Sequence, residues 1–194
     1  FTSAPATAQF LDQGLFFNDG ATATNNGYAV YDATGFVRAM IYTGTPDANT
    51  FQSAGGATLG AATDKHVNLI TAAVTAQTTD SIRTLRITGA FNVTQTSGTT
   101  LTLTEGGLLK IGNTAATISG GTLDATTKEF VIRVEQNTLT VSSLIAGSAG
   151  LTKSGAGTLL ISGHNTGLSG GGDRQCRGTY RKRDHSRYWS TDHQ

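Results

Sequence analysis

Several residue types on which common folds depend are scarce in this sequence. The 194 residues hold one Cys, two Pro and one Trp, and 14% of them are charged, against about 25% in a typical globular domain. With Cys176 as the lone cysteine, a framework of internal disulfides is excluded. The low charge argues against a helical bundle, whose exposed faces need Glu, Lys and Arg. No run approaches the ~18–20 apolar residues of a membrane helix, so we expect no membrane span.

A secretory leader is also missing from the start of the sequence. Residues 1–8 have neither the basic start nor the apolar centre of a signal peptide. Because the chain begins with Phe1 and not with Met, we expect it to be a fragment of a longer protein.

What the sequence holds in abundance is Gly and Thr, with 25 Gly in all. Thr is β-branched and favours strands, and Gly allows the positive φ angles of tight turns. The composition therefore predicts an all-β fold of short strands joined by tight turns.

Charge is divided unevenly along the chain. Residues 1–170 hold 8 Lys/Arg and 10 Asp/Glu, a net charge of −2, whereas residues 171–194 hold 6 Lys/Arg and 3 Asp, a net charge of +3. The body therefore carries no nucleic-acid footprint, and a nucleic-acid partner is excluded unless the basic tail is genuine.

Short runs of alternating apolar residues recur over residues 61–170, which we interpret as β-solenoid repeats. Five Thr-Leu pairs place Leu at positions 85, 101, 123, 139 and 159. These steps are near one coil of a parallel β-helix, in which stacked coils bury continuous Leu, Ile and Val rows and expose Thr, Ser and Asn. A β-sandwich is the alternative, since several short, closely spaced strands also build one.

One segment carries a specific repeat pattern. Residues 150–166 read GLTKSGAGTLLISGHNT and resemble the autotransporter-associated β-strand repeat, roughly G-L-T-K-x-G-x-G-T-L-x-L-S-G-x-N-T. The string YDATGFVR at residues 31–38 also looks like a segment upstream of these repeats. The resemblance implies a right-handed parallel β-helix from an autotransporter passenger-like bacterial protein, located extracellularly or on the outer-membrane surface.

Residues 1–60 form an aromatic-rich part, interpreted as N-terminal coils or a cap. Residues 28–38 predict two short strands around an Asp-Ala-Thr-Gly turn. We expect these aromatics to close one end of the stack, where strand edges would otherwise stay unpaired. An aromatic glycan-binding platform that uses Tyr28, Tyr31 and Phe36 is the alternative.

Residues 171–194 predict an irregular basic tail, since the strand pattern stops after Gly170. Read one nucleotide later, codons for residues 172–182 can spell the repeat-like Val-Thr-Val-Asn-Ala-Gly-Ala-Leu-Ile-Val-Ser, which suggests a frameshifted repeat. The rival is a genuine basic arm for nucleic acid or anionic glycans, with Tyr180, Tyr188 and Trp189 among the Arg residues.

The sequence does not identify catalytic residues. Residues 167–171 match G-x-S-x-G, in which Ser169 would need His164 or His185 as base and Asp173 as orienting acid, but we favour a repeat turn. The four histidines lack metal-ligand spacing, so we expect neither a metal site nor a cofactor.

Charged residues on successive coils are the remaining candidates for a hydrolase or polysaccharide lyase. They are Asp124, Glu129 and Glu135 with Lys128 and Arg133, and we favour a solvated face over a site. Arg83 and Arg86 are likewise interpreted as outward residues on a strand.

The sequence thus favours a structural or adhesive β-solenoid fragment of a secreted or surface-displayed bacterial protein. An enzyme acting on a polysaccharide or ester along the solenoid face, and a glycan-binding module, stay open as alternatives. Surface glycans and host or matrix molecules are the expected partners, and exposed coil ends also allow end-to-end self-association.

Overall fold

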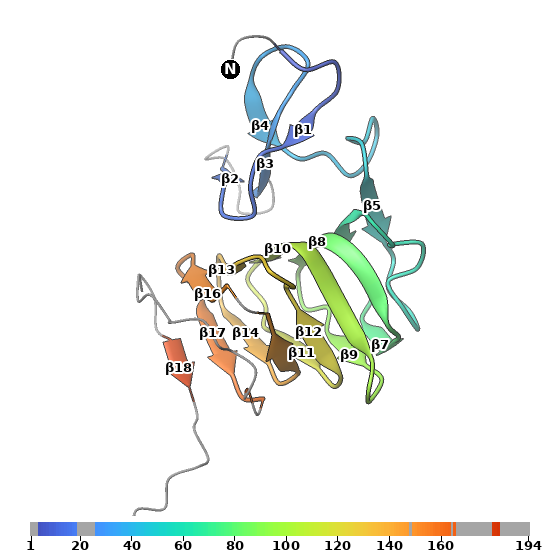
Figure 1. Ribbon diagram of the computed structural model, residues 1–194, viewed down its shortest axis with the longest axis vertical. Helices are drawn as coiled ribbons and strands as arrows, with labels where there is room; N and C mark the ends of the chain where they lie inside the picture. The colour runs from blue at the N-terminus through green and yellow to red at the C-terminus, as the bar shows by residue number, and fades with distance from the viewer. Residues whose placement is uncertain (1–3, 19–25, 148, 164, 166–179, 183–194) are drawn as a thin grey trace, which may run out of the picture.

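The structure is a computed structural model that describes residues 4–18, 26–147, 149–163, 165 and 180–182, the last three by their backbone alone. Within these residues the chain is built from strands and turns, with no helix and hence no helix that could cross a membrane. Strands from residue 50 onward wind into a stack of coils, and a small sheet from the N-terminal part lies beside it (Figure 1).

Each coil contributes parallel strands to up to three faces. The first face is made of β5 (Thr50–Ser53), β6 (His66–Leu69), the second half of β8 (Asp80–Thr88), the second half of β10 (Thr100–Ile111), β13 (Phe130–Val134) and β16 (Leu151–Ser154). The second face is made of β7 (Val74–Gln77), β9 (Val93–Gln95), β11 (Ala116–Ser119), β14 (Thr138–Val141) and β17 (Thr158–Ile161). The third face joins the first halves of β8 and β10 to β12 (Thr122–Asp124) and β15 (Leu144–Ala146). Because every one of these pairs is parallel, the stack is the predicted β-solenoid and not a sandwich of antiparallel sheets.

Apolar rows run through the inside of the stack. On the first face the row is Phe51, Val67, Leu85, Leu108 and Ile132, followed by Lys153. On the second face it is Val74, Val93, Ile118, Val141 and Ile161. All the apolar members except the half-buried Phe51 are at most 2% exposed. Each such buried Leu, Ile or Val contributes about 1.5–3 kcal/mol, so the predicted inward rows are the main source of stability.

The Leu spacing read from the sequence is only partly the spacing of coils. Leu101 pairs with Leu123 and Leu139 with Leu159, so these two steps are true coil repeats. Leu85 instead pairs with Leu108, because Leu85 lies on the first face and Leu101 on the third. The shorter steps of the Leu series therefore connect different faces. Coils also differ in length, since the residues in register along the first face are Phe51, Val67, Leu85, Leu108 and Ile132.

Buried amides hold one corner of the stack. The Gln95 side-chain oxygen accepts a hydrogen bond from the Leu101 N–H at 3.1 Å, and its amide nitrogen donates to Ser143 Oγ at 3.1 Å. One coil earlier, the Gln77 oxygen accepts from the Leu59 N–H at 2.8 Å. These side chains satisfy backbone groups that the turn leaves without a strand partner, which keeps the buried corner free of unpaired donors.

The N-terminal residues form a small antiparallel sheet. Its strands are β1 (Gln9–Phe10), β2 (Phe16–Phe17), β3 (Gly27–Tyr31) and β4 (Val37–Ala39). The hairpin β3–β4 and its turn agree with the two strands predicted over residues 28–38. Asp32 fixes this turn, since its Oδ1 accepts from the N–H groups of Thr34 and Phe36 at 2.9 and 3.1 Å.

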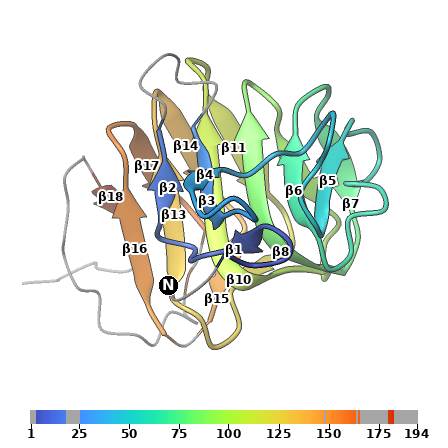
Figure 2. The ribbon, with the colours of Figure 1, turned by 90° about the horizontal axis from the view of Figure 1, so that it is seen from above.

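This sheet packs on the side of the solenoid and does not close its end, contrary to our expectation (Figures 1 and 2). Outward positions on the first face are mostly polar, but on β10 they are Leu109 and Ile111. The sheet covers both with Tyr28 and Tyr42, so that all four side chains are at most 7% exposed. An apolar patch on an outward face needs such a cover, which explains the lateral docking.

The tail contributes one more strand, although we expected it to be irregular. Strand β18 (Tyr180–Lys182) pairs in parallel with β17. The open edge of β17 offers backbone donors and acceptors that any extended segment can use. Several residues singled out in the sequence lie outside the described residues. They are the G-x-S-x-G segment, His164, His185, Asp173, Cys176 and most of the frameshift segment.

Candidate binding cleft

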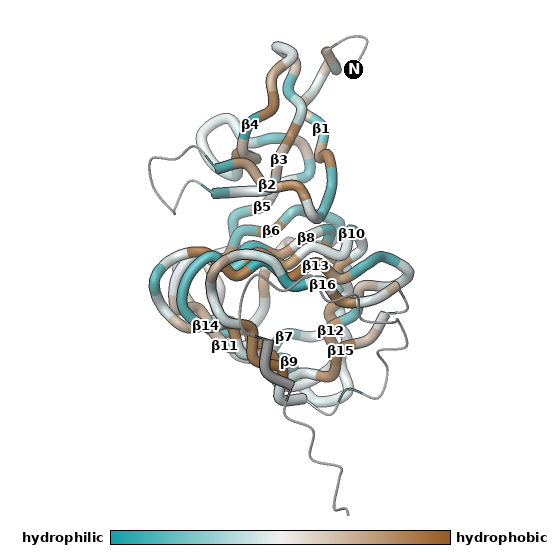
Figure 3. The backbone as a smooth tube through the Cα atoms, turned by 90° about the vertical axis from the view of Figure 1, so that its left-hand side faces the viewer, coloured by the Kyte–Doolittle hydropathy of each residue, from teal (hydrophilic) through white to brown (hydrophobic). Residues whose placement is uncertain are grey.

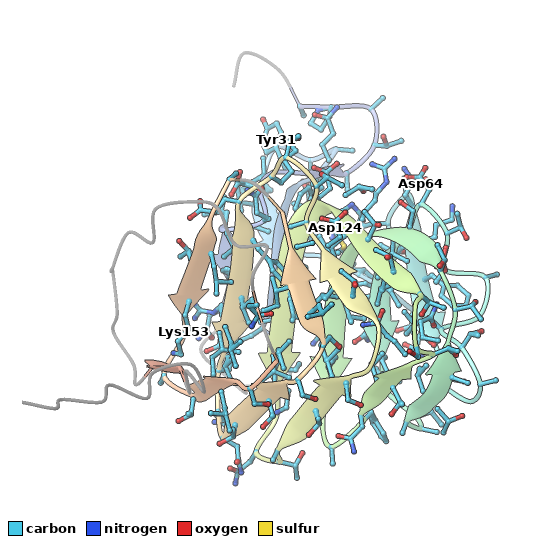
Figure 4. All side chains as sticks on the ribbon, turned by 60° about the horizontal axis from the view of Figure 1, so that its bottom comes forward. Tyr31, Asp64, Asp124 and Lys153 are labelled. Atoms are coloured by element: carbon cyan, nitrogen blue, oxygen red, sulfur yellow. The ribbon has the colours of Figure 1, made fainter. Side chains whose placement is uncertain are left out.

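The predicted carboxylates do not meet in one site. Asp124 accepts a hydrogen bond from the Thr126 N–H at 2.8 Å and thereby fixes its own turn (Figure 4). Glu129 accepts from the Thr152 hydroxyl, and Glu135 accepts from Arg133. Since Glu129 and Glu135 flank opposite ends of β13, they lie about 20 Å apart at the usual rise per residue. That separation is too large for a pair of catalytic carboxylates acting on one glycosidic bond.

The three aromatics proposed as a glycan platform differ widely in exposure. Tyr28 is fully buried and lies edge-on to Phe10, with 5.8 Å between ring centroids. Burial also raises the pKa of its hydroxyl well above the usual value. Tyr31 is half-buried, whereas Phe36 is 70% exposed at the tip of the hairpin. Tyr28 is therefore a packing residue, and the three do not form one flat surface for a ligand.

A cleft opens where the small sheet meets the corner between the third and first faces. Its volume is about 420 Å³. Residues 7–13 cover it, and Asn49, His66, Arg83, Glu105 and Lys128 from successive coils line it. The view along the stack in Figure 3 shows the small sheet lying against one side of the coils.

Charges of alternating sign line the coil corners at this cleft. Arg83 pairs with Asp64 at 3.1 Å, and Lys128 pairs with Glu105 at 3.7 Å. Asp64, Arg83, Glu105 and Lys128 follow one another along the chain at the corner that leads into the first face. The Glu105 and Lys128 side chains are 30% and 50% exposed, so their charged groups are accessible to solvent and to a ligand. Figure 4 labels Asp64, the first of these four residues.

His66 lies under the small sheet at the inner end of the cleft. Its ring is 4.6 Å from that of Phe10 between centroids, and its Nδ1 is 3.0 Å from Thr84 Oγ1. Burial, with a smaller contribution from the nearby Arg83 charge, lowers the pKa of His66 to about 4. The imidazole is therefore neutral at physiological pH and adds no charge to the cleft.

Ion pairs anchor the chain that enters the first coil. Arg38 donates two hydrogen bonds to Asp47, at 2.8 and 2.6 Å, and one to Asp32 at 3.2 Å. Burial opposes ionisation of Asp47, but the bonds from Arg38 and from the Ile41 N–H outweigh it and lower the pKa of Asp47. The Asp47 carboxylate is thus ionised and held by Arg38. The other carboxylates of the cleft are Glu105 and Asp12, of which Asp12 accepts a hydrogen bond from the Gly14 N–H at 2.7 Å.

Sequence reasoning found only part of this cleft. Lys128 was among the candidates, and Arg83 was interpreted as an outward residue, but Glu105 was not considered. The signal was present as charges that recur at positions 83, 105 and 128, in step with the inward residues at 85, 108 and 132. Residues 7–13 could not be assigned to the site, because their place depends on the lateral docking of the small sheet. In the part of the chain that the structure describes, no three His, Cys, Asp or Glu side chains gather as a metal site would require.

The stacked parallel faces, apolar rows and polar corners define a parallel β-solenoid. The chain is 29% identical over 180 residues to the adhesin BmaC autotransporter of Brucella suis biovar 1 (strain 1330). The match covers 85% of this chain and 5% of that relative, so the chain spans about one twentieth of the relative's length. No family model and no solved structure matches the chain. Together, the fold and this similarity confirm the predicted resemblance and a location at the bacterial surface or outside the cell.

Proposed function

We propose that the chain is a structural and adhesive segment of a longer surface protein. The coils supply a stiff rod, and the sides of the rod supply the surface that contacts other molecules. The observation that carries this proposal is the set of apolar rows that runs from coil to coil, in which each coil is supported by its neighbours. The similarity to an adhesin supports contact with surface glycans or with host and matrix molecules as the purpose of such a rod.

Surface display provides the test. The chain is placed on the outside of a bacterium that does not adhere by itself, and cells retained on host monolayers and on matrix-coated wells are counted. The matched control is Leu108→Asp, which places a carboxylate in a fully buried row and unfolds the neighbouring coils. We expect adherence with the native chain and not with the variant. Equal retention of the two, or none above the undisplayed strain, would contradict the proposal.

A further inference from the structure

We propose that the cleft under residues 7–13 binds an uncharged, hydroxyl-rich ligand, a saccharide unit of a surface glycan, through Glu105 and Lys128. This inference rests on the proposed adhesive function and gives it a location. It uses a different surface from the Tyr28, Tyr31 and Phe36 aromatics considered above, of which Tyr28 is buried.

The cleft has the size and stiffness of a ligand site. Its volume of about 420 Å³ lies within the roughly 300–1,000 Å³ that small-molecule sites occupy. The covering segment is fixed by the Leu11 N–H, which donates to the Ala29 carbonyl at 3.2 Å, and by Phe10 against His66. A preformed site spends little binding energy on ordering itself.

Glu105 and Lys128 retain unused hydrogen-bonding capacity. Their charged atoms are 3.7 Å apart, longer than a good N–H···O bond of about 2.7–3.2 Å. An ammonium has three donors and a carboxylate about four acceptor positions. Since a hydroxyl both donates and accepts, two neighbouring sugar hydroxyls can donate to Glu105 and accept from Lys128 at once. The exposed amides of Gln9 and Asn49 offer further donors and acceptors at the rim.

The balance of charge favours an uncharged ligand. Charges of both signs line the cleft, since Arg83 and Lys128 are positive and Asp12, Asp47 and Glu105 are negative. Asp47 is paired with Arg38, and Arg83 is paired with Asp64. A cleft without a field of one sign gives no general attraction to polyanions such as nucleic acid or sulfated polymers.

The small apolar lining favours a saccharide over a peptide. Val30 and Met40 are only 1% and 5% exposed, so they offer little surface to an apolar peptide side chain. Phe10 and Leu11 are half-buried, and the Phe10 ring already packs against His66 and Tyr28, so the cleft offers only a small apolar area, which suits a mostly polar ligand such as a sugar unit.

The test uses the purified chain on an array of neutral, N-acetylated and sialylated oligosaccharides. Variants Glu105→Gln and Lys128→Gln alter the cleft, and Glu129→Gln is the matched control, because it makes the same charge change as Glu105→Gln on the next corner without lining the cleft. Unchanged circular dichroism spectra verify folding. We expect retention of neutral or N-acetylated oligosaccharides, at least about tenfold weaker binding by both cleft variants, and unchanged binding by the control.

Several outcomes would overturn the inference. They are retention of no oligosaccharide, retention of sialylated ones alone, or equal losses in Glu129→Gln and the cleft variants. The adherence assay on the same variants separates this inference from the proposed function. Adherence that persists in both cleft variants overturns the site and leaves the adhesive function standing. Cleft-dependent saccharide binding without adherence supports the site and contradicts the adhesive function.

Discussion

Lys110 and Lys153 occupy inward positions two coils apart, and each ammonium donates to the carbonyls of the two residues that follow it. Lys110 Nζ lies 2.9 Å from Ile111 O and 2.8 Å from Gly112 O, and Lys153 Nζ lies 3.4 Å from Ser154 O and 2.7 Å from Gly155 O. In both cases Gly is the second residue after Lys and has a positive φ, at +83° for Gly112 and +78° for Gly155. In both places the Lys-x-Gly sequence forms a turn at the end of a strand, and the carbonyls of this turn accept hydrogen bonds from the buried lysine.

Replacing Lys110 by Met should stabilise the protein at neutral pH. Lys110 is fully buried, and this burial lowers the pKa of its ammonium. Met removes the cost of holding a charge away from water, and Ile111 O keeps the bond from the Gly89 N–H at 3.1 Å. We expect Lys110→Met to raise the free energy of unfolding by about 1 kcal/mol at pH 7.

The sign of the pH effect provides a second check on Lys110. Between its lowered folded-state pKa and the ordinary value of 10.5, the unfolded chain binds more protons at this lysine. The wild-type protein should therefore gain stability from this lysine as pH rises through that window, whereas the Met variant should not. The difference in unfolding free energy between the two proteins should become smaller at high pH. Urea unfolding at pH 7 and pH 10 measures both effects, with the half-exposed Lys128→Met as the control. A lower urea midpoint for Lys110→Met at both pH values would show that the corner hydrogen bonds matter more than the buried charge.

Alanine substitutions at two glycines should distinguish the cost of a strained backbone from the cost of a steric clash. Gly98 and Gly120 have φ of +77° and +70°, but an added Cβ at Gly98 meets nothing within 4 Å, whereas at Gly120 it would lie 2.1 Å from Gln95 O. Gly98→Ala should cost about 1 kcal/mol from the left-handed backbone alone. Gly120→Ala should cost about 3 kcal/mol or more, because backbone of the neighbouring coil must also move. Thermal or urea unfolding of the two variants gives the comparison, and equal losses would mean that the coils at Gly120 are not in contact.

Tyr28 should hold the small sheet to the solenoid. Tyr28→Ala removes a fully buried ring at this contact, a change that costs about 3–5 kcal/mol in a core. We expect faster hydrogen exchange over residues 8–18 and 26–42, with the solenoid strands protected as before. Phe36→Ala, at a side chain 70% exposed, should leave exchange unchanged. Equal protection in wild type and Tyr28→Ala would contradict the lateral packing.

His66 should make the protein sensitive to mild acid. Its folded-state pKa of about 4 lies below the ordinary 6.5, so the unfolded chain binds the extra proton between these values. The neutral ring thus contributes stability that is complete above pH 6.5 and is lost as pH falls toward 4, by up to about 3 kcal/mol. His66→Gln should lose less stability than wild type between pH 7 and pH 4.5 in urea titrations. Parallel pH profiles for the two proteins would show that His66 accepts its proton without leaving the fold.

The sequence predicted the solenoid better than the arrangement of its faces. Alternating Leu and Thr showed which residues turn inward, because burial depends on each residue and its near neighbours. It did not show that Leu85 and Leu101 lie on different faces, since that depends on where β8 and β10 turn the corner. Leu109 and Ile111 looked like part of one apolar run, although alternate residues of that run point to opposite sides of the sheet.

The candidate cleft was harder to predict for a related reason. Glu105 and Lys128 approach each other because their coils stack, and a separation of one whole coil carries no local pattern. The lateral position of Phe10 and Tyr28 depends on the outward patch of β10, which comes much later in the chain. Long-range docking of this kind leaves only a composition signal, which is why the aromatic segment was recognised and its place was not.

The unequal coil lengths have a consequence for how such a rod can vary. Successive coils differ in length, yet the strands of the first face stay in register from β5 to β16. Extra residues are accommodated at the corners, where the chain meets water, and the inward rows continue across them. A protein of this design can therefore be lengthened by whole coils, or given new side chains at a corner, while the interior remains the same, so that reach and recognition can change independently.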